Sequence, residues 1–259
     1  MKLLGAIAGD IIGSSHEFKP LKTTDFELFT EESAFTDDSV LTVATAEALF
    51  GGLDYGEIYR EYFNRYPHAG YGRRFVSWAS EGSAEPYKSF GNGSAMRISP
   101  VGWWANDMAE CLKEAKRSAE ATHNHPEGVK GAQAVAAAVL MARQGASREE
   151  IKTFVEISFS YDLSTPISKI RPAYSFDVTC QGSVPQALRC FIESTDFESA
   201  VRLAVSLGGD ADTQAAMAGS VAEAYYGSIG EEIERQTLSR LDDFLTEKLL
   251  AFDSFTKKR

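Results

Sequence analysis

The sequence Leu207-Gly-Gly-Asp210-Ala-Asp212-Thr213-Gln214 leads into a small apolar run, Ala215–Tyr226, that predicts a buried helix. Two carboxylates beside a helix start need no function, because the positive end of the helix dipole favours them there. A second cluster of the same kind changes this interpretation. Thr36-Asp37-Asp38 also stands before a long apolar helix, Val40–Phe50. We therefore expect the two acidic clusters, from opposite ends of the chain, to meet in the core of a helical protein.

Four carboxylates that converge in a core repel one another strongly unless cations neutralise them. Carboxylate and hydroxyl oxygens are hard ligands, which suit Mg²⁺ or Mn²⁺ better than zinc. The sequence therefore predicts a site for two Mg²⁺ or Mn²⁺ ions. Its predicted ligands are Thr36, Asp37, Asp38, Asp210, Asp212 and Thr213.

Together with three other segments, these clusters resemble the ADP-ribosylglycohydrolase family. The other segments are Gly9-Asp10-Ile-Ile-Gly13 followed by Glu17, the central Gly91-Asn-Gly-Ser-Ala-Met-Arg97, and Thr122-His123. The resemblance extends from residue 5 to residue 227, in the family's order. It implies an all-α fold, namely a compact single-domain orthogonal helical bundle over residues 1–259. It also implies two Mg²⁺ or Mn²⁺ ions and cleavage of the bond between ADP-ribose and an attached group.

The bulk composition is that of an ordinary soluble domain. The chain has 259 residues, 44% hydrophobic and 24% charged, with no linker or repeat. A net charge of -11 argues against general nucleic-acid affinity, so we expect nucleic acid as a partner only in the form of an ADP-ribosylated end. Three cysteines without CxxC spacing favour a reducing compartment, and we expect a cytoplasmic monomer without membrane contact. We expect the apolar N-terminus, ended by Asp10, to be a retained helix.

Hydrophobic periodicity predicts at least ten helices and no strand run. The irregular, acidic segment 20–35 precedes the first metal cluster and is in a common position for a lid. Segment 160–182 is expected to be a loop with a short helix near Ile167. The other helices are expected at 3–14, 38–50, 55–66, 70–79, 107–121, 126–143, 147–159, 184–193, 197–206, 215–226 and, as more than one, 231–252.

Glu17 follows Asp10 by seven residues, and the resemblance gives it the position of a functional glutamate in serine-type ADP-ribosyl hydrolases. We expect Glu17 to position or deprotonate the attacking water, with Asp38 as a second catalytic carboxylate. Asp10 is more simply interpreted as a hydrogen-bonded structural acid. His16, in the same loop as Glu17, is expected to be solvated.

The segment around Gly91-Asn92-Gly93 is a glycine-rich turn before an apolar helix, where backbone N–H groups can hold a diphosphate. It matches neither the dinucleotide fingerprint nor a P-loop. His123 and His125 lack the further ligands that zinc requires. With the resemblance, the predicted substrate-binding residues are Ser89, Phe90, Gly91, Asn92, Gly93, Ser94, His123 and, on a looser match, Ser183. Arg73 and Arg74 could meet phosphates but need no such role.

Three functions fit these patterns. The first is a metal-dependent hydrolase that cleaves the N- or O-glycosidic bond between ADP-ribose and a protein side chain or small-molecule acceptor. The second is a phosphatase with an Asp-x-Asp core, but Thr213 follows Asp212 immediately and helices surround it, which argues against a dehalogenase-type motif. The third is a non-catalytic ADP-ribose-binding or crystallin-like member of the same fold. All six predicted metal ligands and Glu17 are present, which favours the enzyme.

Overall fold

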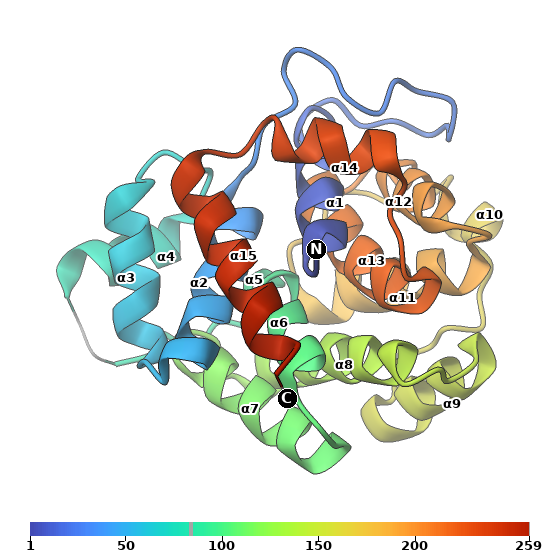
Figure 1. Ribbon diagram of the computed structural model, residues 1–259. Helices are drawn as coiled ribbons and strands as arrows, with labels where there is room; N and C mark the ends of the chain where they lie inside the picture. Colours follow the sequence, from blue (N-terminus) through green and yellow to red (C-terminus); the bar gives the residue numbers. More distant parts are fainter. Residues whose placement is uncertain (83–84, 259) are drawn as a thin grey trace.

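Helix α13 (Ala211–Tyr226) is the element around which the other helices pack. Fourteen of its 16 residues are buried, and it contacts α1, α8, α11 and α12. The protein is described by a computed structural model that covers residues 1–82 and 85–258. Helix α1 (Leu4–Ser14) lies against α13 over its whole length (Figure 1), so the start of the chain and the second acidic cluster are neighbours in space.

The expectation of an all-α fold is confirmed. In residues 1–82 and 85–258 the only strand-like pairing is an isolated bridge between Gly91 and Thr179. The remaining helices are α2 (Asp37–Gly51), α3 (Tyr55–Arg65), α4 (Arg73–Glu81), α5 (Gly93–Met96), α6 (Ser99–Trp104), α7 (Met108–Glu120), α8 (Pro126–Arg143), α9 (Arg148–Phe159), α10 (Ile167–Ile170), α11 (Cys180–Glu193), α12 (Phe197–Val205), α14 (Glu231–Leu238) and α15 (Asp243–Thr256).

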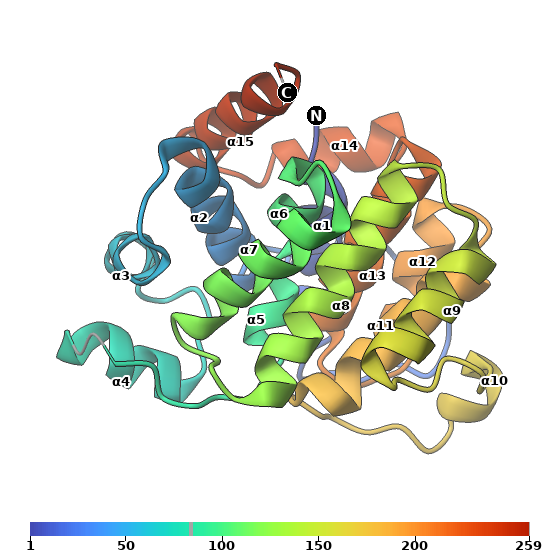
Figure 2. The same ribbon diagram turned by 90° about the horizontal axis from the view of Figure 1, so that it is seen from below.

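The helices form two flanks around the α1–α13 pair. Helices α2, α3 and α4 lie on one side, and α9 to α12 lie on the other, with α8 running beside α13 (Figures 1 and 2). Helix α15 packs on α2. No helix in the described residues is both long and apolar enough to cross a membrane. The three cysteines are buried free thiols.

Two helices begin earlier than their apolar runs predict. Helix α13 starts at Ala211 rather than Ala215, which places Asp212 and Thr213 in its first turn. Helix α11 starts at Cys180 rather than Val184, because Thr179 Oγ1 accepts the N–H of Gly182 and caps the helix. The first turns of both helices contain polar residues, so the apolar pattern begins later than the helix itself.

Candidate active site

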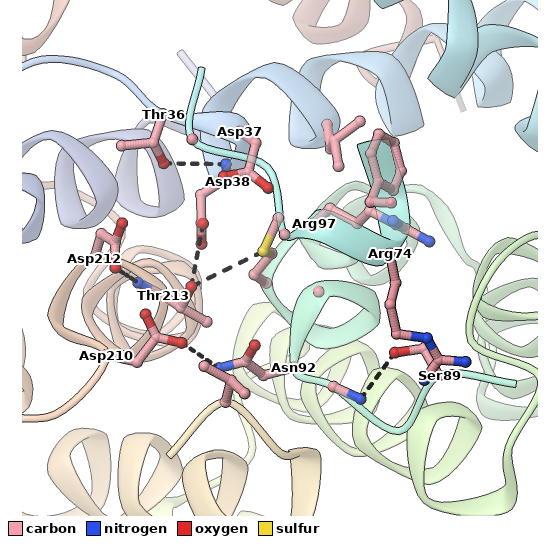
Figure 3. A pocket seen from close by; sticks show the side chains of 18 of the residues that line it. Thr36, Asp37, Asp38, Arg74, Ser89, Asn92, Arg97, Asp210, Asp212 and Thr213 are labelled. Carbon is pink, nitrogen blue, oxygen red and sulfur yellow. Dashed lines mark hydrogen bonds between the residues drawn. The ribbon is translucent and has the colours of Figure 1, made fainter. Parts of the chain in front are cut away.

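The two acidic clusters lie at the N-terminal ends of α2 and α13, as expected. Thr36 is the N-cap of α2, and its hydroxyl accepts the N–H of Asp38 at 3.2 Å. Asp210 precedes α13, and Asp212 lies in its first turn. Thr213 Oγ1 donates to Asp38 Oδ2 at 3.1 Å, which joins the two clusters directly (Figure 3). Each helix directs the positive end of its dipole at these carboxylates.

Close backbone contact between α1 and α13 sets the spacing of this acidic region. A Cβ atom on Gly9 would lie 2.2 Å from the carbonyl oxygen of Ala215, and one on Gly13 would lie 2.4 Å from Asp212 Cα. Only glycine allows two helices to approach so closely. The spacing Gly5-x3-Gly9-x3-Gly13 therefore has a packing reason, and the contact fixes the backbone of Asp212.

Asp10 braces the start of α2. It is fully buried, and its carboxylate accepts the backbone N–H and hydroxyl of Thr36 at 2.9 and 2.7 Å. It also accepts the N–H of Ser39 at 3.0 Å and the Ser39 hydroxyl. The interpretation of Asp10 as a hydrogen-bonded structural acid agrees with these four contacts. Its carboxylate nonetheless belongs to the same group of acids as Asp38.

The carboxylates form two groups that share one member. Oxygen atoms of Asp10, Asp38 and Asp212 lie within 4.8 Å of one another, as do those of Glu17, Asp210 and Asp212. Burial, reinforced by the charge of Asp210, raises the pKa of Asp212 well above its usual range. Burial together with Asp212 likewise raises the pKa values of Asp37 and Asp38. Burial and mutual repulsion therefore disfavour the charged forms of these acids unless a positive charge compensates them.

The donor set fits divalent cations. Asp38 Oδ1 is buried and has no hydrogen-bond partner in the described chain, so its lone pairs are available to a ligand. The ligand atoms of the predicted set are carboxylate and hydroxyl oxygens, and the predicted ligands line the same cavity. Mg²⁺ and Mn²⁺ match such hard ligands. The Thr36 hydroxyl is the least available of them, since it already donates to Asp10 and caps α2.

Glu17 lies in the loop after α1 and reaches the same cavity. Its carboxylate is half-buried beside Asp210 and Asp212. Burial, then the charges of Asp212 and Asp10, raises its pKa to about 8.

His16 differs from the expectation of a solvated residue. It is half-buried edge-on against Phe26, with ring centroids 5.1 Å apart.

The glycine-rich turn is tied to the acidic region by one side chain. Asn92 Nδ2 donates to Asp210 Oδ2 at 2.7 Å (Figure 3). The N–H groups of Gly91 and Asn92 already donate, to Ser89 Oγ at 3.1 Å and to the carbonyl of Val178 at 2.7 Å. The helix that follows, α5, has only four residues. The expected backbone cradle for a diphosphate is therefore weaker than the sequence indicates.

Arginine and histidine side chains occupy the region around this turn. Arg73, Arg74, Arg97 and His123 line the cavity with Ser89, Gly91, Asn92 and Gly93. Arg74 donates to the Tyr87 carbonyl, and its guanidinium lies 5.1 Å from the centroid of the Tyr87 ring. His123 is buried, and burial together with Arg97 and Arg74 lowers its pKa well below the usual range. Arg74 and Ser89 stand across the cavity from the acidic region (Figure 3).

Three of the predicted binding residues do not line the cavity. Phe90 is 41% exposed and packs on His125, with ring centroids 5.3 Å apart. The hydroxyls of Ser94 and Ser183 are buried and donate at 2.7 Å to the carbonyls of Gly128 and Thr179. Their positions in the sequence motifs reflect packing of the turn and of α11.

The cavity also includes residues that we did not predict: Leu41, Gly70, Gly72, Phe75, Tyr87, Met96, Phe176 and Val178, with Arg97 quoted only as part of a motif.

Segment 20–35 is not positioned as a lid. None of its residues lines the described cavity. Arg202 Nη1 donates to the carbonyls of Thr24 and Phe26 at 3.1 and 2.6 Å, and Arg240 Nη2 donates to that of Thr30 at 3.4 Å. These arginines dock the segment on the C-terminal helices, where it projects at the top of Figure 1. Lack of periodicity does not distinguish a docked loop from a mobile one.

The geometry defines a class of site: an all-helical protein with a cavity of about 400 Å³, whose lining is acidic on one side and basic on the other. The sequence profile of the ADP-ribosylglycohydrolase family matches residues 2–256. The chain belongs to the ADP-ribosylglycohydrolase family. Membership places it among the hydrolases of ADP-ribosyl linkages and confirms the enzyme class predicted from the sequence.

Individual relatives and a solved structure agree with this assignment. The mouse ADP-ribosylhydrolase ARH3 is 26% identical, over 87% of this chain and 82% of its own. The ADP-ribosylarginine hydrolase Tri1 of Pseudomonas putida (strain GB-1) is 25% identical, over 95% and 76%. The ADP-ribosyl-[dinitrogen reductase] glycohydrolase of Rhodospirillum rubrum is 27% identical, over 92% and 88%. A solved ADP-ribosylglycohydrolase-related protein complex has a TM-score of 0.73 at 27% identity, covering 96% of this chain and 94% of its own.

Proposed function

We propose that the protein is a divalent-cation-dependent hydrolase of the N- or O-glycosidic bond between ADP-ribose and an acceptor group. The observation that carries this proposal is the division of one cavity into an acidic region and a basic region. The acidic region consists of Glu17, Asp37, Asp38, Asp210 and Asp212 with Thr36 and Thr213. The basic region consists of Arg73, Arg74, Arg97 and His123 around the turn at Ser89–Gly93.

This division matches the chemistry of ADP-ribose. The diphosphate is an anion, and the positive side chains of the basic region favour it by charge and by hydrogen bonding. The distal ribose offers neutral hydroxyls to the acidic region. Bound Mg²⁺ or Mn²⁺ would be held by Asp37, Asp38, Asp210, Asp212, Thr36 and Thr213, would offset their mutual repulsion, and would orient oxygen atoms of the ligand.

In this proposal Glu17 would act on the attacking water. It reaches the cavity beside Asp210 and Asp212, at the side where the distal ribose would lie. Its pKa of about 8 describes the acid cluster without cations. Positive charge next to a carboxyl group lowers its pKa and favours the ionised form that a general base needs. Asp38, which accepts a hydrogen bond from Thr213, would help to orient the ribose relative to the attacking water.

The non-catalytic alternative makes a different prediction about the same cavity. A structural or binding member needs the fold and the basic region, but it does not need a water-positioning carboxylate in the acidic region. In this protein Glu17 lies beside Asp210 and Asp212, which supports a catalytic function. The acceptor released with ADP-ribose is open among arginine, serine, a nucleic-acid end and a small metabolite.

The experiment is a panel of defined ADP-ribosylated substrates, assayed for free ADP-ribose with Mg²⁺, with Mn²⁺ and with EDTA. ADP-ribose thermal shift runs in parallel. We expect binding in every case where cations are present, and turnover of at least one acceptor class that EDTA abolishes. Turnover that persists in EDTA contradicts the cation dependence. Binding without turnover of any acceptor supports the non-catalytic alternative.

A further inference from the structure

His123 has one ring nitrogen bonded within the protein and the other directed at the glycine-rich turn. Its Nδ1 lies 2.7 Å from Thr122 Oγ1. Its Nε2 faces the turn, because a Cβ atom on Gly93 would lie only 3.1 Å from it. The ring is buried and lines the cavity. A neutral histidine has a single N–H, so the partner at Nδ1 decides what Nε2 offers to a ligand.

Arg97 determines the role of the Thr122 hydroxyl. Arg97 Nη2 donates to Thr122 Oγ1 at 2.8 Å, and a guanidinium can only donate. Arg97 is fully buried and, within the part of the chain that the structure describes, has no carboxylate partner. Its guanidinium lies over the Tyr59 ring, 4.1 Å from the centroid. The arginine is therefore a fixed positive donor that occupies one lone pair of the Thr122 oxygen.

We propose that Arg97 and Thr122 are positioning residues that hold His123 in the Nε2–H tautomer. With one lone pair accepting from Arg97, the Thr122 hydroxyl donates its proton to Nδ1 of His123. Nε2 then carries the only N–H of the ring and presents it to an anionic oxygen in the basic region of the cavity. The assignment of that oxygen to the diphosphate of ADP-ribose rests on the proposed function, whereas the tautomer does not.

The opposite tautomer, in which Nδ1 carries the proton and donates to Thr122, is disfavoured by the groups near the two ring nitrogens. Thr122 also contacts the phenol of Tyr87, so its proton could in principle go there while Nδ1–H donates to Thr122. Tyr87 keeps its own proton at neutral pH, because burial raises its pKa to about 12. A protonated phenol can donate to the second lone pair of the Thr122 oxygen, which leaves the Thr122 proton to Nδ1 of His123. With the diphosphate bound as the proposed function has it, the opposite tautomer would also direct the lone pair of Nε2 at an anion, an argument separate from the hydrogen bonds at Nδ1.

The tautomer is measured without ligand by long-range ¹H–¹⁵N correlation on protein labelled with ¹⁵N-histidine. The chain has four histidines, and the His123→Gln variant identifies the His123 signals by their loss. We expect Nδ1 of His123 to resonate as unprotonated nitrogen and Nε2 as protonated nitrogen. Thr122→Val removes the hydroxyl at similar volume, and we expect it to shift the ring toward Nδ1–H. Thr122→Ser keeps the hydroxyl and should keep the wild-type pattern.

Affinity for ADP-ribose with Mg²⁺ is then measured by titration calorimetry. We expect Thr122→Val to weaken binding roughly tenfold, the usual effect of one hydrogen bond to a charged group, and Thr122→Ser to stay within about twofold. A wild-type spectrum with protonated Nδ1 overturns the inference even if Thr122→Val fails to fold. Unchanged tautomer and affinity in a folded Thr122→Val also overturn it. A wild type that does not bind ADP-ribose would instead refute the proposed function. The NMR spectrum would still test the tautomer by itself.

Discussion

The acidic and basic regions of the cavity are built by different means. The acidic region stands on the first turns of two long helices, α2 and α13, and the backbone contact of α1 with α13 fixes their spacing. The basic region stands on a four-residue helix, a turn and side chains from α4 and the end of α7. Its positive charge comes from arginines, and its hydrogen bonds join side chains and backbone groups, as from the Asn92 N–H to the carbonyl of Val178 and from Arg74 to that of Tyr87.

This difference indicates which region tolerates change. Carboxylates that hold cations need fixed positions, and backbone-to-backbone packing gives them little freedom. A diphosphate can be met by several positive side chains, so the loss of one is partly compensated by the others. We therefore expect substitutions in the acidic region to affect the rate, and those in the basic region to affect affinity by smaller factors.

The largest effect should follow from Glu17→Gln, which keeps size and hydrogen bonding but removes the charge. We expect kcat to fall by about 10²–10⁴-fold, the usual range for acid–base assistance, while ADP-ribose affinity changes little. Single-turnover kinetics and titration calorimetry measure the two quantities. Glu27→Gln, an exposed glutamate in the following loop, is the matched control. If Glu17→Gln instead loses ADP-ribose affinity and keeps its kcat, Glu17 has a structural role and not a catalytic one.

The next largest effect should follow from Gly9→Ala, which tests the backbone contact beneath the acidic region. Helix propensity alone predicts stabilisation by about 1 kcal/mol. The added Cβ would lie 2.2 Å from the Ala215 carbonyl oxygen, so α1 and α13 must separate. We expect destabilisation by about 3 kcal/mol or more and weaker Mn²⁺ binding. Chemical denaturation gives the free energy of unfolding, and calorimetry gives the metal affinity.

The control for that variant is Gly72→Ala, used for stability only. A Cβ atom on Gly72 meets nothing within 4 Å, and its backbone φ of -59° suits any residue. We expect its free energy of unfolding to change by less than about 1 kcal/mol. If Gly9→Ala is as stable as Gly72→Ala, the α1–α13 contact does not set the geometry of the acids.

The acidic region could be predicted from the sequence because its signals are local. Asp37, Asp38, Asp210 and Asp212 each stand beside an apolar helix, and the structure brings them together. The spacing in the family segment indicates Glu17, whereas Asp10 is predicted as a structural acid and its place beside Asp38 and Asp212 comes from the structure. The reason for the glycines around Asp10 was not predicted, because the partner backbone is some 200 residues away in the chain. No local pattern encodes which helix a glycine face meets.

The basic region was predicted less well because its residues act through contacts distant in sequence. Ser94 and Ser183 belong to the expected motifs, yet their hydroxyls serve carbonyls inside the fold. Tyr87 and Phe176 carry no motif and reach the cavity only through the path of the chain. Arg97 is buried and has no acidic partner among the residues that the structure describes, but the sequence alone does not distinguish it from a surface arginine.

A smaller effect is expected from Asn92→Ala, which tests whether the two regions are independent. Asn92 is buried, and its Nδ2 donates to Asp210 at 2.7 Å, so its loss should disturb both regions. We expect Mn²⁺ affinity to fall about tenfold, as for other groups that orient a metal ligand, and ADP-ribose affinity to fall with it. Asn106→Ala, at a distant helix start, is the control. Weaker ADP-ribose binding with unchanged Mn²⁺ affinity would show that the regions are separate.

The smallest effect concerns the stability of the cation-free protein as pH changes. Burial and neighbouring acids raise the pKa of Glu17 from 4.5 to about 8, and burial raises that of Asp210 from 3.8 to about 6. Each group therefore holds its proton more tightly in the folded state than in the unfolded chain. The resulting stability is fully present below the ordinary pKa values and is lost as pH rises through about 6 and 8.

We therefore expect the wild type in EDTA to melt a few degrees lower at about pH 8.5 than at about pH 5.5, since ~1 kcal/mol corresponds to roughly 2–4 °C in a protein of this size. Calorimetry with and without Mn²⁺ measures the difference. Saturating Mn²⁺ should reverse it, because the cation replaces the protons as the compensating charge. Asp212→Asn, which removes the carboxylate common to both groups, should flatten the pH dependence in EDTA. An equal slope in that variant would mean that the pH dependence arises elsewhere, from the net charge of -11 rather than from repulsion in the acidic region.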